Sequence, residues 1–278
     1  MPASLAADTT PSRDPAVDGR FLLELPDSWS FALPSGGVLM TASLRALALH
    51  PAAEGLSPVS ATTIFCLPLQ AGALTLDARV LRRGSTTLQA EVTARQGGVV
   101  GLVTTATFAA ERAGPELRAE LPALPSPDEA DAWTEPSAPH GRRVVPFFEQ
   151  VEQRVAHGAR WWEPEWAAGE ARFARWFRYL SPQRAGAHLD PLALPPLADT
   201  MPPALRQALG PGAAGFDAPS LDLTVHFLEP TTSDWLLVDA RCRAARAGYA
   251  TADVEVWGED GRLAARGTQT MFIRRPRR

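Results

Sequence analysis

One acid in the segment LADTMPPALRQALG (residues 197–210) stands where it could serve either structure or chemistry. Asp199 comes shortly before Pro202 and Pro203 and a short apolar pattern with helical spacing. An aspartate accepts hydrogen bonds from the free N–H groups of a first helical turn, and proline fits that turn, so helix capping alone would explain the segment. A carboxylate in a partly desolvated pocket instead has a raised pKa and can act as a general base towards water. The segment leaves both interpretations open.

The composition narrows the chemistry that the rest of the chain could perform. The 278 residues include no lysine and no asparagine, which excludes a Schiff-base lysine and a phosphate-loop lysine. The sequence has no GxSxG motif, and its five histidines show no paired spacing, so it indicates neither a serine hydrolase of that kind nor a metal site. We therefore expect no metal and no cofactor.

Charge, hydropathy and cysteine usage limit the partners and the compartment. The net charge of −4 offers no attraction for nucleic acid. No apolar run approaches the ~18 residues that a membrane span requires, and the start of the chain lacks the pattern of a signal peptide. Cys66 and Cys242 lie far apart without a CxxC motif, which is typical of a reducing compartment. We expect a cytoplasmic protein with no nucleic-acid partner and no membrane partner.

The chain repeats itself once. Phe65-x-x-Pro68 recurs 162 positions later as Phe227-x-x-Pro230, and Asp77-Ala78-Arg79 recurs at the same offset as Asp239-Ala240-Arg241. After a two-residue insertion the offset becomes 164 positions. Matches that follow one another at a nearly fixed offset indicate a duplicated structural unit.

Each copy has the pattern of a helix followed by an antiparallel meander. Residues 36–49 carry apolar side chains at helical spacing, and residues 199–209 are their counterpart. Downstream of each helix come segments of alternating polarity, separated by turn residues: TLDARVL, LQAEVTAR and VGLVTTATF in the first copy, and LLVDARCR, ATADVEVW and RLAARGTQTMF in the second. Each half should therefore form one sheet wrapped on a helix.

The composition also suggests where the units begin and end. Residues 112–142 are rich in proline, alanine and acid, which is typical of a linker. The organisation expected from this is a disordered N-terminus, an N-terminal unit, a linker and a C-terminal unit that carries the catalytic residues, at 1–18, 19–111, 112–142 and 143–278.

A duplicated helix and meander resembles the double hot-dog fold, an α+β architecture in which two antiparallel sheets each wrap around a long helix. The resemblance to the type II (TesB-like) acyl-CoA thioesterase family is more specific and covers about residues 20 to 275. In the second half it rests on PSLDLTVHFLEPTTSDWLL, ARAGYATADVEVWGEDGRLAARGTQTMFIR and LADTMPPAL. In the first half it rests on SGGVLMTASLRAL, FCLP and VLRRGSTTLQAEVTARQGG.

This resemblance implies an activity and three site residues. Members of the family hydrolyse acyl-CoA to free fatty acid and CoA, with a water held by an Asp, a Thr and a Gln of the second hot-dog. These positions correspond to Asp199, Ser220 and Gln269, so a serine hydroxyl replaces the threonine. Leu223 stands where a histidine is common. The resemblance also implies acyl-CoA as the substrate and a homodimer as the assembly.

The two copies differ at the three site positions, which favours a functional role for Asp199. Their counterparts in the first copy are Gly37, Pro58 and Thr105. A purely structural cap should recur, because both helices need one, although glycine can itself cap a helix. The first copy offers a different contribution through Gly36 and Gly37, since glycines let helix N–H groups approach and stabilise a thioester oxyanion.

Some alternatives stay open at this point. Strict alternation places Asp222 on the same strand face as Ser220, so Asp222 could be the acid instead. A hot-dog hydratase or dehydratase, which usually pairs Asp with His, is a second possible enzyme. A non-catalytic acyl-CoA-binding protein is the alternative outside enzymes, because Ser220 and Leu223 depart from the family pattern.

Overall fold

The computed structural model of the chain describes residues 2–133, 145–160, 166–211 and 217–274. The strands of the first half are β1 (Ser12–Arg13), β2 (Arg20–Leu25), β3 (Ser57–Phe65), β4 (Gly72–Arg83), β5 (Thr87–Gln96) and β6 (Val99–Ala109). Those of the second half are β7 (Asp131–Ala132), β8 (Val151–His157), β9 (Arg172–Tyr179), β10 (Arg184–Ala185), β11 (His188–Leu189), β12 (Asp222–Phe227), β13 (Trp235–Arg246), β14 (Tyr249–Gly258) and β15 (Leu263–Phe272). The α-helices are α1 (Leu5–Thr9), α2 (Gly36–Ala48), α3 (Leu194–Ala198) and α4 (Pro202–Leu209).

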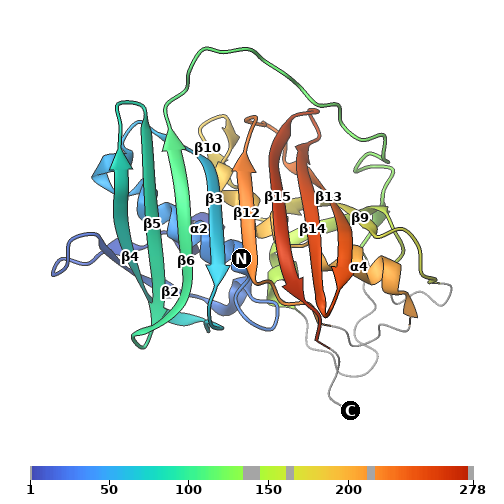
Figure 1. The fold of residues 1–278 in the computed structure, drawn as a ribbon. Coiled ribbons are helices and arrows are strands. Elements are labelled where there is room, and N and C mark those ends of the chain that lie inside the picture. Colours follow the sequence, from blue (N-terminus) through green and yellow to red (C-terminus); the bar gives the residue numbers. More distant parts are fainter. Residues whose placement is uncertain (1, 134–144, 161–165, 212–216, 275–278) are drawn as a thin grey trace.

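The two halves join edge to edge into one antiparallel sheet of 13 strands among the described residues. Its order is β1-β2-β4-β5-β6-β3-β12-β15-β14-β13-β9-β8-β7, so β3 and β12 meet at the centre. The helices lie on one side of this sheet, behind the strands in Figure 1. The short β10 and β11 form a separate hairpin. The expected meander of each half is confirmed by β4–β5–β6 and β13–β14–β15.

A pseudo-twofold axis passes through the β3–β12 junction. Thr62 and Thr224 are partners in the strand register there, and their hydroxyl groups form a 2.9 Å hydrogen bond. The two threonines are 162 positions apart, which is the offset of the sequence repeat. Residues at equivalent positions of the two copies therefore meet each other along this axis.

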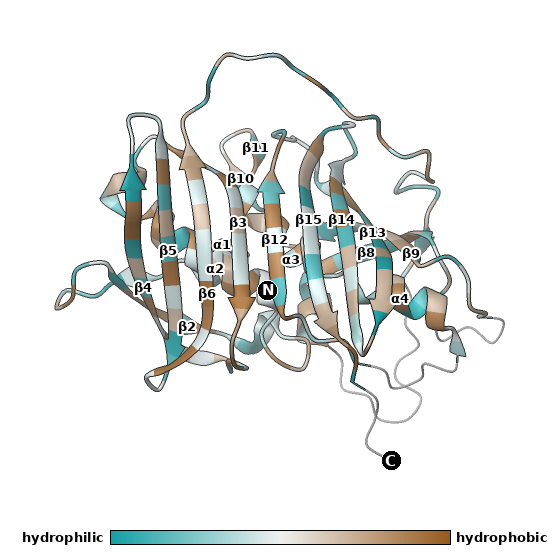
Figure 2. Cartoon of the chain, in the orientation of Figure 1, coloured by the Kyte–Doolittle hydropathy of each residue, from teal (hydrophilic) through white to brown (hydrophobic). Residues whose placement is uncertain are grey.

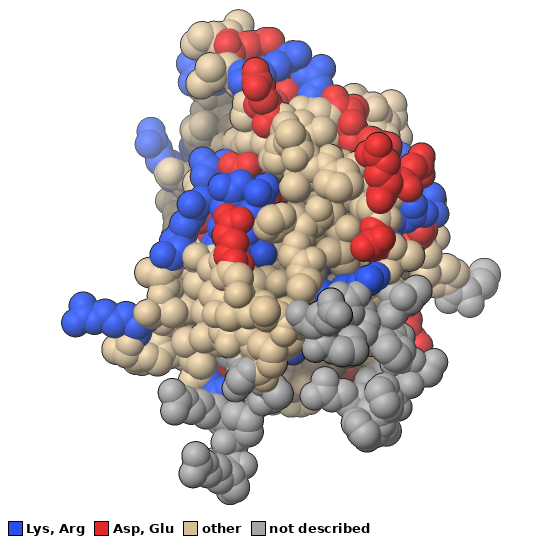
Figure 3. All heavy atoms as spheres, turned by 90° about the vertical axis from the view of Figure 1, so that its right-hand side faces the viewer, with Lys and Arg blue, Asp and Glu red and all other residues tan. Residues whose placement is uncertain are grey.

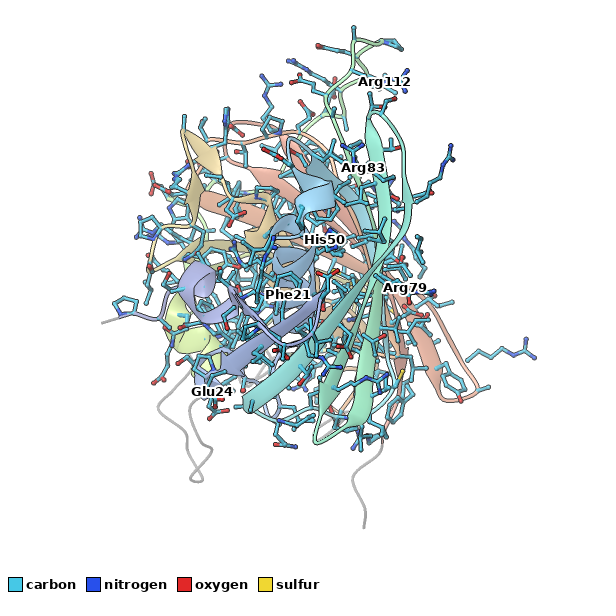
Figure 4. All side chains as sticks on the ribbon, turned by 90° about the vertical axis from the view of Figure 1, so that its left-hand side faces the viewer. Phe21, Glu24, His50, Arg79, Arg83 and Arg112 are labelled. Carbon is cyan, nitrogen blue, oxygen red and sulfur yellow. The ribbon has the colours of Figure 1, made fainter. Side chains whose placement is uncertain are left out.

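Alternation of polarity explains which face of the sheet becomes the core. In β2, Phe21, Leu23 and Leu25 are buried, while the residues between them are more exposed. Seen from the β2 edge, Phe21 points inward towards the helices, whereas Arg79 lies on the outer side of the sheet (Figure 4). Apolar and polar segments follow one another along the strands in Figure 2, as a half-buried sheet requires.

The helical layer differs between the halves. Helix α2 is one continuous element, and most of its residues are buried. The second half has two short helices, α3 and α4, in place of the single helix expected over residues 199–209. Pro202 and Pro203 have no N–H to donate, so the hydrogen-bond ladder of α3 cannot continue into α4. Asp199 consequently ends α3 and does not begin α4.

The N-terminal segment also differs from its expectation, because residues 2–18 are ordered against the helices instead of disordered. Leu5 in α1 is completely buried, and the indole nitrogen of Trp29 donates to Asp8 at 2.8 Å. Arg45 of α2 donates to the Thr9 hydroxyl at 2.9 Å. Tertiary contacts thus hold α1 in place, and the local sequence does not predict these contacts.

Part of the expected linker belongs to the sheet. Within residues 112–133, β7 pairs with β8, and Trp176 donates its indole N–H to the carbonyl of Pro125 at 2.8 Å. Figure 1 shows this connection passing over the top of the sheet from β6 to the second half. Residues 134–142 of the expected linker lie outside the described part of the chain.

The outer surface at the β8–β9 end carries both signs of charge. Figure 3 shows Arg beside Asp and Glu over this side of the molecule, and an ion pair between Arg178 and Glu152 joins β9 to β8. None of the helices in the described residues is long and apolar enough to cross a membrane.

Candidate active site

Asp199 caps a helix, but the helix belongs to the other half of the molecule. Its Oδ2 accepts the backbone N–H of Gly37 at 3.0 Å and the hydroxyl of Ser35 at 2.9 Å. Ser35 is the N-cap residue of α2, yet its hydroxyl makes no capping bond to that helix. Asp199 takes over this role from 162 positions away, next to the positive end of the α2 dipole.

The second carboxylate oxygen of Asp199 faces the two other expected site residues. Gln269 Nε2 donates to Asp199 Oδ1 at 2.7 Å and also to Ser220 Oγ. The Ser220 hydroxyl lies 3.5 Å from the same Asp199 oxygen, at the limit of a hydrogen bond. Residues far apart in sequence are thus brought together from α3, β15 and the segment before β12.

The strand geometry explains why these side chains converge. Ser220 forms an isolated bridge with Met271, and the backbone of Leu221 donates to Thr270, so the segment before β12 runs beside the end of β15. Gln269 lies on the inward face of β15, where it is 1 % exposed. In that apolar layer the Gln269 amide nitrogen finds its hydrogen-bond acceptors in Asp199 and Ser220.

Burial raises the pKa of Asp199 above its ordinary value. Hydrogen bonds from Gly37, Ser35, Gln269 and Ser220 act in the opposite direction, because they stabilise the carboxylate. The side chain is 8 % exposed, so desolvation outweighs four donors. A carboxylate with a raised pKa is a stronger base than an ordinary aspartate and suits proton abstraction from water.

Asp199 and Ser220 line a cavity of about 590 Å3 between the two halves. Its walls are largely apolar and include Phe31, Leu39 and Phe65 of the first half. Such a volume and lining are typical of small-molecule sites. Gln269 does not line this cavity but lies behind Asp199 and Ser220, so it positions both groups.

The two glycines of the first half have different surroundings. Gly37 donates its N–H to Asp199, and a Cβ at this position would lie 2.2 Å from the Pro195 carbonyl oxygen, so only glycine fits. Gly36 lines the cavity, and its N–H has no acceptor among the residues that the structure describes. Gly36 is therefore the better placed of the two to meet a ligand.

The alternative acid, Asp222, has a structural partner. Its Oδ1 accepts the backbone N–H of Thr270 at 2.8 Å, which fixes the start of β12 against β15. Asp222 does not line the cavity. Ser35, in contrast, is a site residue that sequence reasoning missed, although it directly precedes the two glycines already singled out.

Within the described residues, no group of three or more His, Cys, Asp or Glu side chains could hold a metal ion. The donors around Asp199 are a backbone N–H, two hydroxyl groups and one amide, and all of them complement a carboxylate. The arrangement can therefore hold an ionised acid beside an apolar cavity that the Ser220 side chain also lines.

Comparison with known families places the chain in one of them. The model of the acyl-CoA thioesterase C-terminal domain matches residues 121–273, and that of the acyl-CoA thioesterase N-terminal domain matches residues 25–109. The chain belongs to the acyl-CoA thioesterase family. The expected resemblance to type II acyl-CoA thioesterases is thereby confirmed. No curated protein is similar enough in sequence to match the chain.

Solved structures confirm the expected hot-dog fold over the whole chain. A hot-dog protein from Alicyclobacillus acidocaldarius is 23% identical, with a TM-score of 0.82 over 100% of both chains. The tesB protein of Mycobacterium avium subspecies paratuberculosis is 21% identical, with a TM-score of 0.77 over 98% of each chain. The acyl-CoA thioesterase II TesB2 of Mycobacterium marinum is 20% identical, with a TM-score of 0.75 over 98% of this chain and 99% of the other.

Proposed function

We propose that this chain is an acyl-CoA thioesterase in which Asp199 activates a water molecule for attack on the thioester. The observation that carries the proposal is a buried carboxylate of raised pKa in the wall of an apolar cavity, which accepts from Gln269 and caps a helix of the other half of the molecule. Membership of the acyl-CoA thioesterase family supports acyl-CoA as the substrate.

The chemistry follows from the positions of the groups. Asp199 accepts a proton from the water while the oxygen of that water bonds to the thioester carbonyl carbon. The negative charge that develops on the carbonyl oxygen is stabilised by the N–H of Gly36 at the positive end of α2. The C–S bond then breaks, and the proton held by Asp199 passes to the CoA sulfur, which leaves as a thiol. The carboxylate returns to its starting state without metal or covalent intermediate.

Ser220 has a supporting role in this scheme. Its oxygen accepts from Gln269, and its own hydrogen bond to Asp199 is at the 3.5 Å limit, so its proton can turn towards the water or the thioester. Gln269 donates to both Ser220 and Asp199 and so fixes the relative positions of these two side chains. Their positions determine the direction from which the water attacks the carbonyl carbon. Water positioning by a neutral hydroxyl is a smaller effect than proton transfer by a base.

The assay that tests the function is incubation with a series of acyl-CoA thioesters while free thiol and the acyl product are followed. We expect stoichiometric release of CoA and free acid. A change at the β-carbon without thiol would instead identify a hydratase, and saturable binding without turnover would identify a carrier. No histidine among the described residues lines the cavity, so the pairing of Asp with His that hydratases use finds no support here.

Substitutions of Ser220 test the water-holding arrangement. Ser220→Ala should lower kcat about 2- to 10-fold, because one neutral hydrogen bond contributes about 0.5–1.5 kcal/mol. Ser220→Thr keeps the hydroxyl and should retain the turnover of the wild type. Steady-state kinetics on one acyl-CoA would check both variants. A folded but inactive Thr variant would show that the hydroxyl at this position does not meet the water.

A further inference from the structure

A buried arginine lies in the cavity wall, where the strand pattern calls for an apolar residue. In β9, Phe173, Arg175 and Phe177 alternate onto the inward face of the sheet, and Arg175 is only 2 % exposed. The segment RFARWFRY thus places a guanidinium group inside the core. Arginine is almost never fully buried unless it is paired, so this position requires an explanation.

The protein holds the Arg175 cation without neutralising it. Nη1 donates to Gln153 Oε1 at 2.8 Å, and this is the hydrogen bond that the described residues make to the guanidinium. Aromatic rings surround the guanidinium carbon at 4.7 to 5.8 Å from their centroids, those of Phe177, Trp133, Phe173 and Phe148. No carboxylate among the described residues forms an ion pair with Arg175.

Arg175 remains a cation at neutral pH. Burial lowers its pKa to about 9, and no nearby acid offsets this effect. Aromatic faces and one amide oxygen stabilise a positive charge only in part, because neither carries a full negative charge. A buried cation in this state gains most from an anion that can reach its remaining N–H groups.

The cavity is the route by which such an anion can arrive. Arg175 and Phe148 line the same cavity as Asp199 and Ser220. An acyl chain whose thioester lies at Asp199 therefore extends within reach of a wall that contains a guanidinium group. A methyl terminus would leave that group unpaired, whereas a carboxylate would accept two parallel hydrogen bonds from the arginine fork.

We propose that the cavity selects acyl groups that end in a carboxylate, and that Arg175 binds this carboxylate. The preferred substrates are then CoA monothioesters of dicarboxylic acids. The inference rests on the proposed thioesterase function, because it assumes that the thioester is held at Asp199. Gln153 is a positioning residue, which fixes the plane of the guanidinium through Nη1.

The test compares pairs of thioesters that have equal chain length and differ at the far end of the acyl group. Butyryl-, hexanoyl- and octanoyl-CoA are matched with succinyl-, adipoyl- and suberoyl-CoA, and kcat/KM is measured by thiol release. For at least one length we expect the carboxylate to raise kcat/KM roughly 10- to 100-fold, as befits a hydrogen bond to a charged group. In Arg175→Met the ratio within that pair should fall to about unity or below.

Arg178 provides a matched control in the same strand. It points to the opposite face of the sheet, pairs with Glu152 and does not line the cavity. Arg178→Met should therefore leave the ratio between the paired substrates as it is in the wild type. Arg175→Lys, which keeps the charge but not the fork, should lose part of the preference and serves if the methionine variant does not fold.

The outcomes separate this inference from the function on which it rests. If the wild type cleaves the uncharged thioesters as well as, or better than, every ω-carboxy partner, the inference is wrong while the thioesterase function stands. If Arg175→Met lowers kcat/KM equally for both members of a pair, Arg175 is a structural cation. If no thioester is cleaved, the proposed function fails, and thermal stabilisation by adipoyl-CoA beyond that by hexanoyl-CoA still decides whether the carboxylate is bound.

Discussion

Asp199→Asn should abolish thioester hydrolysis while the protein still folds and binds acyl-CoA. Loss of a general base costs about 10²- to 10⁴-fold in turnover. The fold should tolerate the change, because the Asn oxygen can still accept from Ser35 and Gly37. Its NH2 group would face Gln269, whose amide can rotate and present Oε1, an atom with no hydrogen-bond partner among the described residues. Steady-state kinetics with a matched binding measurement would check this result.

We also expect Asp199→Asn to change how the stability of the protein depends on pH. The pKa of Asp199 is raised in the folded protein, so ionisation of this group favours the unfolded chain. The stabilising effect of the protonated group is complete below the ordinary aspartate pKa and is lost as pH rises through the raised value. The melting temperature of Asp199→Asn minus that of the wild type should therefore increase as pH rises through this window, and then level off.

Asp222→Asn is the control for these experiments. Its carboxylate accepts a backbone N–H outside the cavity, so turnover should change far less than in Asp199→Asn. Near-normal turnover in a folded Asp199→Asn protein, together with inactivation of Asp222→Asn, would reverse the assignment of the base.

Gln269→Glu should move the acidic limb of the pH–rate profile upward and reduce turnover at neutral pH. The amide nitrogen of Gln269 lies 2.7 Å from Asp199 Oδ1, so a carboxyl group there would share a proton with Asp199. Like charges this close raise the pKa of the pair, and Asp199 must be ionised to accept a proton. The fraction of active enzyme at a given pH below the optimum therefore falls.

Gln269→Met separates the effect of charge from the loss of the amide. This variant removes the donor to Asp199 and Ser220 without adding an acid, so the limb should shift less than in Gln269→Glu. The pH dependence of kcat/KM measures both shifts. A folded Gln269→Glu protein with an unchanged profile would show that Gln269 does not act through Asp199.

The duplicated architecture was predictable from the sequence, because a repeat at a fixed offset imposes the same meander twice. The family motifs also placed Asp199, Ser220 and Gln269 among the candidate residues, and the structure brings their side chains together. Local patterns could not show that Asp199 ends α3 and caps α2, because the docking of the two halves depends on long-range contacts.

Other features escaped prediction for different physical reasons. Arg175 follows the alternation of β9, but a strand that is buried on both faces does not reveal which residues point inward. Residues 2–18 contain few apolar side chains, and it is the surface offered by α2 and Trp29 that orders them. In each case the structure of the segment is determined by the elements that pack against it, and the sequence of the segment alone does not show them.

The hydrogen bond between Gly37 and Asp199 joins residues at equivalent positions of the two copies. In a dimer of identical single units, any substitution at this position would appear on both sides of the axis. Two aspartates would then face each other and could not both ionise, while two glycines would supply no base. Fusion of the copies into one polypeptide removes that restriction, since each position can mutate alone. In the duplicated chain the two equivalent positions therefore have different roles. The second half contributes the acid, and the first half contributes the backbone N–H that binds it.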